Sequence, residues 1–296
     1  MNYPWHVGAA SLLASFLLAL GLAQSVRAES SKITPAKQAS CDRSQFRVIL
    51  DVGHSAEVPG ALSARGVGEY TFNLSLAQAI EKKMLEAGFS KTTLLITPGK
   101  AIAGLVSRVN YAAHTPADLF LAIHHDAVPD SFLQKWIYEG KNHNYCDRFK
   151  GHSIFVSHDN DEYKTSLQFA RLLGLRLKSQ GLQYTPHYVE RFMGRRQRQL
   201  VDAEAGVYRF DNLVVLRSTN KPAVLLEAGS IINRDEELLM ADPAHQATIA
   251  SAVTNAVESY CSAQGSRKPE QRIARRPQQA EMHPPLLFPI FGPAPR

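Results

Sequence analysis

The chain has 296 residues, of which 45% are hydrophobic and 20% charged, a composition typical of a globular protein. A domain of this length can bury roughly 75% of its unfolded surface, so folding does not depend on disulfides. The formal net charge of +6 resides largely in the C-terminal tail, which leaves too little for a nucleic-acid-binding domain.

The N-terminus has the pattern of a secretory signal. Residues 7–23 are apolar and uncharged, and a small-x-small motif ends at Ala28. We therefore predict a cleavable signal peptide over 1–28 and a polar linker over 29–40. An uncleaved membrane anchor is the alternative, because no Lys or Arg precedes the apolar stretch. Export predicts a periplasmic protein, or alternatively a secreted one, that has no membrane-spanning segment after cleavage.

The folded domain is expected over residues 41–263 as a single α/β unit. Short apolar runs alternate with segments of 3.6-residue periodicity, which predicts a mostly parallel, twisted sheet of about six strands with helices on both faces. The expected strands are 46–51, 92–97, 118–123, 153–157, 213–216 and 223–227. The expected helices are 69–87, which Gly88 stops, 102–113, 165–179 and 243–260.

Three segments do not fit this alternation. Residues 128–151 show no clear period and are expected to form an inserted loop with at most one helical turn. The stretch 181–211 is basic, with an arginine cluster at 191–198 that could contact anionic glycan or stem-peptide carboxylates, although a solvated face is favoured. Residues 264–296 are basic and proline-rich, which predicts a disordered tail.

Export permits disulfides. Cys41 and Cys261 bracket the domain, and the ends of a domain often lie close together, which favours that pair and leaves Cys146 free. None of the cysteines has the close spacing typical of structural zinc sites.

Three apolar runs end on residues that could serve a metal site. The first runs into Gly53-His54, the second into His124 and the third into Glu227. Because the carboxyl ends of parallel strands meet at one edge of a sheet, these side chains should converge. Two imidazoles and a carboxylate indicate zinc-hydrolase chemistry, in which three protein ligands leave one position open for water.

The residues alone leave the ligand set open. His124 and His125 are neighbours on a strand, so only one of them can face the metal. For the third ligand, Glu57 gives a His-x-x-Glu spacing with His54, whereas Glu69 opens the next helix. Asp126 is a candidate acceptor for a ligand imidazole.

The sequence resembles the zinc-dependent N-acetylmuramoyl-L-alanine amidases that split septal peptidoglycan. Four segments carry the resemblance in the same order: Asp51-Val52-Gly53-His54, then Glu69 with Asn73, then Ala122-Ile123-His124-His125-Asp126, and finally Leu213-Val214-Val215-Leu216-Arg217 followed by Pro222-Ala223-Val224-Leu225-Leu226-Glu227-Ala228-Gly229. The resemblance spans roughly 46–260. Val52, Ala122 and Asp126 replace the family's Pro, Ser and Asn.

This resemblance implies one Zn²⁺ held by His54, Glu69 and His124, with Glu227 as the general base. It also implies hydrolysis of the amide between N-acetylmuramic acid and L-alanine, with weaker roles near the site for Asn73, Asp126 and Arg217. Some family members carry an insertion that blocks the cleft until a partner binds. We therefore hypothesise that 128–151 limits access to the zinc and is the target of an activator.

Two alternatives remain at the level of sequence. One is another cell-wall zinc peptidase or deacetylase that uses Glu57 as a ligand. The other is an inactive peptidoglycan-binding regulator, which the presence of all ligands and the base disfavours.

Overall fold

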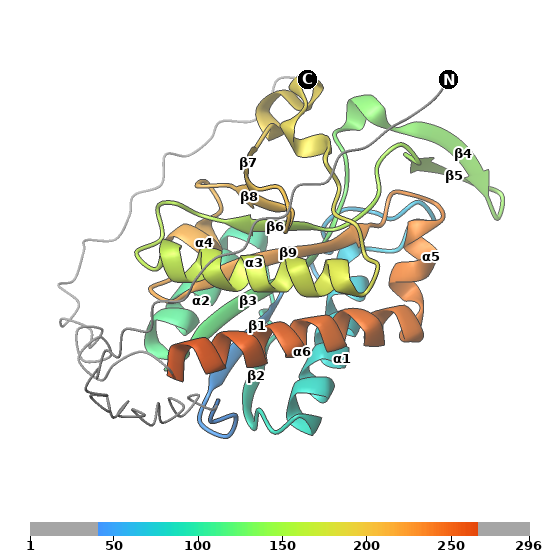
Figure 1. Cartoon of the computed structure of the whole chain (residues 1–296). Helices are drawn as coiled ribbons and strands as arrows, with labels where there is room; N and C mark the ends of the chain where they lie inside the picture. The colour runs from blue at the N-terminus through green and yellow to red at the C-terminus, as the bar shows by residue number, and fades with distance from the viewer. Residues whose placement is uncertain (1–40, 266–296) are drawn as a thin grey trace, which may run out of the picture. The chain divides into compact units, whose positions relative to one another are not determined.

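A central mixed sheet organises residues 41–265, the part of the chain that this computed structural model describes. The predicted signal peptide, the linker and the tail from residue 266 onward lie outside the described residues. The strands, shown in Figure 1, are β1 (Arg47–Val52), β2 (Lys91–Leu95), β3 (Leu119–Asp126), β4 (Gln134–Tyr138), β5 (Lys141–Tyr145), β6 (Ser153–Val156), β7 (Gln199–Asp202), β8 (Val207–Arg209) and β9 (Ala223–Ser230). The helices are α1 (Glu69–Glu86), α2 (Ala101–His114), α3 (Tyr163–Ser179), α4 (Val214–Arg217), α5 (Glu236–Ala241) and α6 (Pro243–Gly265), with 3-10 segments η1 (Asp130–Phe132), η2 (His187–Val189) and η3 (Arg191–Arg196).

The sheet has seven strands in the order β2-β1-β3-β9-β6-β8-β7. Strands β2, β1, β3 and β9 are parallel, as are β6 and β8, whereas β6 runs antiparallel to β9 and β7 antiparallel to β8. The prediction of a mostly parallel α/β sheet is confirmed. The sheet has seven strands, whereas about six were expected from the sequence.

Alternation along the strands divides the core between the two faces of the sheet. In β1, Val48 and Leu50 join the core against α1, α3 and α6, while Ile49 joins the core against α2 and α4. In β3, Phe120 and Ala122 belong to the α2 face. Because side chains alternate, His124 continues on the α2 face and His125 on the α1 face. Figure 1 shows α3 and α6 side by side on one face of the sheet.

The prediction of a strand over 213–216 is wrong. These residues lie in and before the short helix α4. An apolar run of four residues fits one helical turn as well as a strand, so periodicity could not distinguish them. The far strands of the sheet, β7 and β8, come instead from the basic stretch 181–211, and their short length left no readable alternation.

The insertion 128–151 contains more order than expected. Strands β4 and β5 form a two-stranded antiparallel hairpin outside the main sheet. Its turn residues, Glu139 and Gly140, both have positive φ, 48° and 74°, as a tight hairpin turn requires. The half-buried residues alternate with exposed ones along both strands, and they are Trp136, Tyr138, His143 and Tyr145.

A disulfide closes the ends of the domain. Cys41 is bonded to Cys261 in α6, with the two Cα atoms 5.1 Å apart, and Cys146 is a buried free thiol. The pairing expected from the sequence is thus present. Within residues 41–265, none of the helices has the length and apolarity needed to cross a bilayer.

Candidate metal centre and active site

Two histidines converge on one buried carboxylate at the carboxyl edge of the sheet. Glu69 lies 2.9 Å through Oε2 from His54 Nε2 and 2.9 Å through Oε1 from His124 Nδ1. The three potential ligand atoms lie within 4.8 Å of one another, and this is the one such group of His, Cys, Asp or Glu residues in the described part of the chain. The structure therefore brings together the three residues that the resemblance singled out.

Glycine makes room for this arrangement at two positions. A Cβ on Gly53 would lie 2.4 Å from the His124 ring, and a Cβ on Gly60 would lie 2.5 Å from Glu69 Oε2. Gly60 also has φ +79°, which strains any other residue. The loop from His54 to Glu69 can thus lie directly against the cluster.

His54 itself adopts the left-handed conformation, with φ 65°. That conformation is uncommon outside glycine and needs support from its surroundings. Arg108 of α2 supplies it, since its guanidinium donates hydrogen bonds to the carbonyls of Val52, at 2.9 Å, and of His54. The same guanidinium pairs with buried Asp51 at 2.9 Å. Sequence reasoning missed Arg108, because nothing in the spacing of α2 links it to the His54 turn.

Asn73 holds the carboxylate from the next turn of α1. Its side-chain amide donates to Glu69 Oε1 at 3.1 Å and to the Gly53 carbonyl at 3.2 Å, and Asn73 is fully buried. Its Oδ1 lies 2.8 Å from His125 Nδ1, which directs His125 away from the cluster. The expectation that only one of the two adjacent histidines faces the site agrees with this geometry.

Electrostatics favours an ionised Glu69. Burial raises the pKa of this carboxyl, but hydrogen bonds from His124 and His54 outweigh burial and lower the pKa well below its ordinary value. Burial also lowers the pKa of His124, which favours the neutral imidazole. A charged Glu69 carboxylate beside a neutral His124 imidazole is the protonation state in which both can bind a cation.

Glu227 lies opposite His124 on the neighbouring strand. The two residues are register partners in β3 and β9 and therefore share one face of the sheet. Glu227 Oε2 is enclosed and has no hydrogen-bond partner among the described residues. Burial, reinforced by Asp126 and Glu69, raises its pKa well above the ordinary value. A carboxyl in this environment has a high proton affinity.

Two expectations from the sequence differ from the structure: Glu57 as a metal ligand, and Asp126 as an acceptor for a ligand imidazole. Glu57 is exposed, and its carboxylate accepts a hydrogen bond from the Gly99 N–H at 3.1 Å, outside the cluster. Asp126 does not accept from His54 or His124, because both of its oxygens accept from the Tyr188 hydroxyl, at 2.8 and 2.7 Å. Arg217 is exposed at the end of α4, and its weaker role near the site stays a prediction.

A groove of about 260 Å³ leads from the cluster toward α2 and α4. His54, His124, Asp51 and Arg108 line its polar end, and the remaining wall is mainly apolar. The apolar lining residues are Val58, Leu105, Leu213, Val214, Val215 and Leu225. The insertion 128–151 contributes none of the residues that line this groove.

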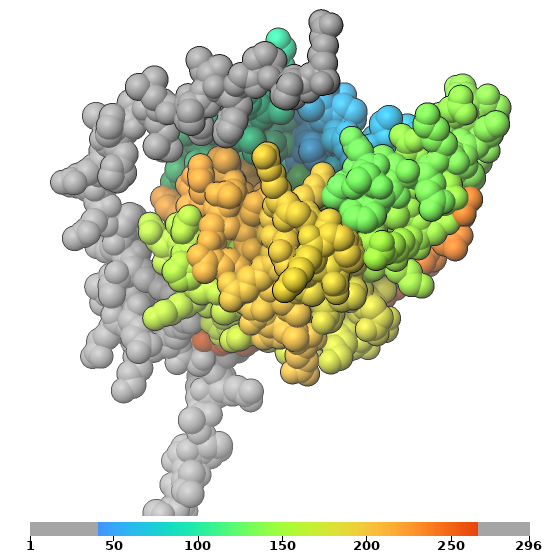
Figure 2. All heavy atoms as spheres, turned by 90° about the horizontal axis from the view of Figure 1, so that it is seen from above, coloured from blue at the N-terminus to red at the C-terminus, as the bar shows by residue number. Residues whose placement is uncertain are grey.

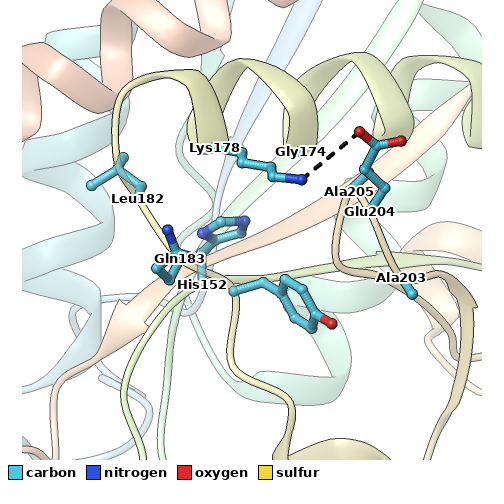
Figure 3. Close-up of a pocket in the computed structure, with 9 residues that line it drawn as sticks. His152, Gly174, Lys178, Leu182, Gln183, Ala203, Glu204 and Ala205 are labelled. Carbon is cyan, nitrogen blue, oxygen red and sulfur yellow. Dashed lines mark ion pairs between the residues drawn. The ribbon is translucent and has the colours of Figure 1, made fainter. Parts of the chain in front are cut away.

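A second cavity, of about 150 Å³, lies between α3 and the turn that joins β7 to β8. Figure 3 shows His152 pointing into it and the Lys178–Glu204 ion pair, 3.8 Å between Nζ and Oε1, at its wall. It shares no lining residue with the groove at the metal cluster. This second cavity is therefore separate from the candidate active site, whose His54 and His124 line the groove.

Comparison with known proteins gives a consistent family. A family model described as N-acetylmuramoyl-L-alanine amidase matches residues 48–259. The chain is 25% identical over 230 residues to the N-acetylmuramoyl-L-alanine amidase AmiA of Escherichia coli K12, covering 72% of this chain and 75% of the relative.

Two solved structures share the fold. The CwlD amidase of Clostridioides difficile, solved in complex with the GerS lipoprotein, superposes with a TM-score of 0.53 at 21% identity and covers 74% of this chain and 99% of that one. The amidase Ami1 of Mycobacterium smegmatis gives a TM-score of 0.54 at 15% identity, with 74% and 98% covered.

Proposed function

The chain belongs to the N-acetylmuramoyl-L-alanine amidase family, and from this premise we propose that it uses one zinc ion to cleave peptidoglycan. The bond cleaved is the amide between the lactyl group of N-acetylmuramic acid and L-alanine of the stem peptide. The observation that carries the proposal is the cluster of His54, Glu69 and His124 with Glu227 opposite it on the next strand.

The donor set fits zinc. Two imidazole nitrogens and one carboxylate are a common set of protein ligands for catalytic zinc, and they leave a fourth position open. Asn73 orients Glu69, and Arg108 holds the turn that carries His54. A zinc ion in this position supplies a water of lowered pKa and polarises the substrate carbonyl.

Glu227 is suited to hold and transfer the proton in this reaction. Oε2 of its carboxyl is enclosed and has no hydrogen-bond partner among the described residues, and the high proton affinity of this carboxyl favours uptake of a proton. A divalent cation nearby opposes the effect of burial, because an opposite charge favours the ionised form of a carboxyl. We assign Glu227 the role of general base, which takes the proton of the attacking water, and of general acid, which delivers that proton to the leaving amine nitrogen as the C–N bond breaks.

The apolar groove beside the cluster suits the groups that flank the scissile amide. Both the lactyl group and L-alanine carry a methyl group next to this bond. Leu105, Val215 and Leu225 offer a wall against which such methyl groups can lie. Glu57 does not join this donor set, because its carboxylate accepts a hydrogen bond from the Gly99 N–H outside the cluster.

Digestion of purified sacculi tests this function. The zinc-loaded protein should release stem peptides that begin with a free L-alanine amine, as identified by mass analysis. Glu227→Gln should retain zinc but lose activity by about 10²- to 10⁴-fold, because a general base contributes on that scale.

Glu57→Gln is the matched control and should keep both zinc and activity. Zinc loss in Glu57→Gln together with zinc retention in Glu69→Gln would reverse the ligand assignment. Release of sugar fragments without free stem peptides would contradict the reaction itself.

We further propose that a partner protein acts on the hairpin β4–β5. The hairpin lies against the loop that joins His54 to Glu69: the Trp136 indole N–H donates to the Ala64 carbonyl at 2.9 Å, and the Arg65 guanidinium lies 5.5 Å from the Trp136 ring centroid. A partner that moves the hairpin would therefore move a loop that contacts the metal cluster through Gly60. The structure of CwlD with the GerS lipoprotein supports the idea of a protein partner.

We propose the periplasm as the site of action, with secretion as the alternative. The predicted signal peptide and the Cys41–Cys261 disulfide support an oxidising compartment outside the cytoplasm. Peptidoglycan, the proposed substrate, lies in the same compartment.

A further inference from the structure

The arginine cluster of the sequence lies on η3, close to the carboxyl edge of the sheet. This segment is anchored through Met193, which is buried, and Phe192, which stacks on Phe149 with ring centroids 5.7 Å apart. Figure 2 shows the segment on the surface next to the insertion, and Phe132 of the insertion contacts Phe192 edge-on at 5.3 Å. The anchoring fixes where the arginines of η3 are presented.

One of these arginines reaches the active-site edge. Arg196 donates a hydrogen bond from Nη1 to the carbonyl of Ala127 at 2.8 Å. Ala127 directly follows β3, the strand that carries His124. A guanidinium has five N–H groups in a planar fork, and Arg196 forms no ion pair with an acid in the part of the chain that the structure describes. Most of its fork is therefore available to a ligand.

The surroundings of Arg196 are rich in carboxylates. Glu69, Asp126 and Glu227 gather at this edge, and Tyr188 and His187 pack beside Asp126. The charge of Arg196 acts on both Asp126 and Glu227, so its guanidinium lies within electrostatic reach of both carboxyl groups. An anionic substrate that approaches these carboxyl groups needs a compensating positive charge.

We propose that Arg196 binds a carboxylate of the stem peptide beside the scissile amide and thereby selects for free-acid stem peptides. The inference rests on the proposed function. In peptidoglycan the second stem residue is joined through its side-chain carboxyl, which leaves its α-carboxylate free one residue from L-alanine. The planar guanidinium of arginine can form two parallel hydrogen bonds with a carboxylate, a geometry that suits recognition of this group.

Two soluble muropeptides that differ in one group test this subsite: one carries D-isoglutamate after L-alanine and the other carries D-isoglutamine. With the wild-type, zinc-loaded protein we expect kcat/KM to be about tenfold higher for the acid, mainly through KM, as a charge-assisted hydrogen bond contributes on this scale. Arg196→Gln should lose this discrimination, so that the ratio of kcat/KM for the acid to kcat/KM for the amide falls from about ten to about one.

The matched control is Arg191→Gln, which removes an exposed charge from the same segment and should discriminate like the wild type. Persistent tenfold discrimination in Arg196→Gln, or an equal loss on both substrates, would overturn the subsite while leaving the amidase function intact. If the wild-type protein cleaves neither muropeptide but digests sacculi, the subsite is also wrong, because the peptide carboxylate would not suffice for recognition. Failure on all three substrates would overturn the proposed function itself.

Discussion

At the scale of single residues, the geometry of the metal cluster depends on a side chain that cannot bind the metal. Arg108 reaches from α2 across the end of β1 and satisfies two carbonyls of the His54 turn. It also neutralises Asp51, which is 1% exposed. The left-handed conformation of His54 is thus held by an ion pair on the opposite side of its backbone.

We predict that Arg108→Met weakens zinc binding by about 10- to 100-fold, the usual cost of removing a group that orients a metal ligand. Chelator competition measures the zinc dissociation constant directly and does not require turnover. Because the substitution leaves Asp51 buried without its partner, the double variant Asp51→Asn/Arg108→Met restores a folded reference. If this double variant binds zinc as tightly as the wild type, Arg108 does not position His54.

A second residue-scale effect concerns His152 in the cavity of Figure 3. Neither ring nitrogen has a hydrogen-bond partner among the described residues, and burial lowers the pKa of His152 from 6.5 to about 4. The unfolded chain therefore binds a proton between these pH values that the folded chain does not. Stability from this residue is complete above pH 6.5 and is lost as the pH falls toward 4.

Between pH 7 and pH 5, His152 should lower the free energy of unfolding by about 2 kcal/mol. His152→Phe, which keeps an aromatic ring in the cavity, should remove this part of the pH dependence. Urea unfolding at the two pH values measures it, and His114→Gln, at an exposed position, should leave the dependence unchanged. An equal pH dependence in His152→Phe and the wild type would contradict the assignment.

At the scale of elements, the hairpin β4–β5 contacts the loop that joins His54 to Glu69. Its contacts run through Trp136 to Ala64 and Arg65, and Ile137 on its outer side is 72% exposed. None of residues 128–151 lines the groove, and the hypothesis that the insertion limits access to the zinc stays a prediction.

We therefore expect Trp136→Ala to reduce kcat/KM on sacculi by about fivefold, since the substitution removes a hydrogen bond and a cation–π contact together worth on the order of 1 kcal/mol. Ile137→Ala, on the same hairpin, is the control and should retain full activity. Increased activity in Trp136→Ala would indicate that the hairpin obstructs the site.

At the scale of the whole molecule, one covalent bond joins the start of the domain to its last helix. Cys41 and Cys261 are 220 residues apart in sequence. Closing so long a loop restricts the unfolded chain strongly, and removing such a bond costs about 2–5 kcal/mol.

Cys41→Ser/Cys261→Ser should lower the free energy of unfolding by that amount, as measured by urea denaturation under oxidising conditions. Added reductant should destabilise the wild type and leave the double variant unchanged. Titration of the denatured, non-reduced protein should detect one thiol, that of Cys146. Detection of three thiols in the purified, non-reduced protein would contradict the pairing.

The sequence by itself determined the architecture where patterns were long. The runs that became β1, β3 and β9 were apolar enough to be read as buried strands, and the residues that end them anticipated His54, His124 and Glu227 at one edge. The helix from Glu69 ends where Gly88, with φ +90°, was expected to stop it. These features follow from local periodicity and from the rule that parallel strands share an edge.

Residue spacing alone left open which carboxylate joins the histidines, and although the family resemblance indicated Glu69, only the tertiary structure shows why it is Glu69 and which side chains support the cluster. Glu57 and Glu69 both follow His54 in sequence, and the choice depends on how the loop folds back through Gly60. Arg108 and Arg196 come from segments distant in sequence from the residues they reach. Their roles depend on packing between elements, and short segments such as 213–216 carry too few residues for periodicity to reveal that packing.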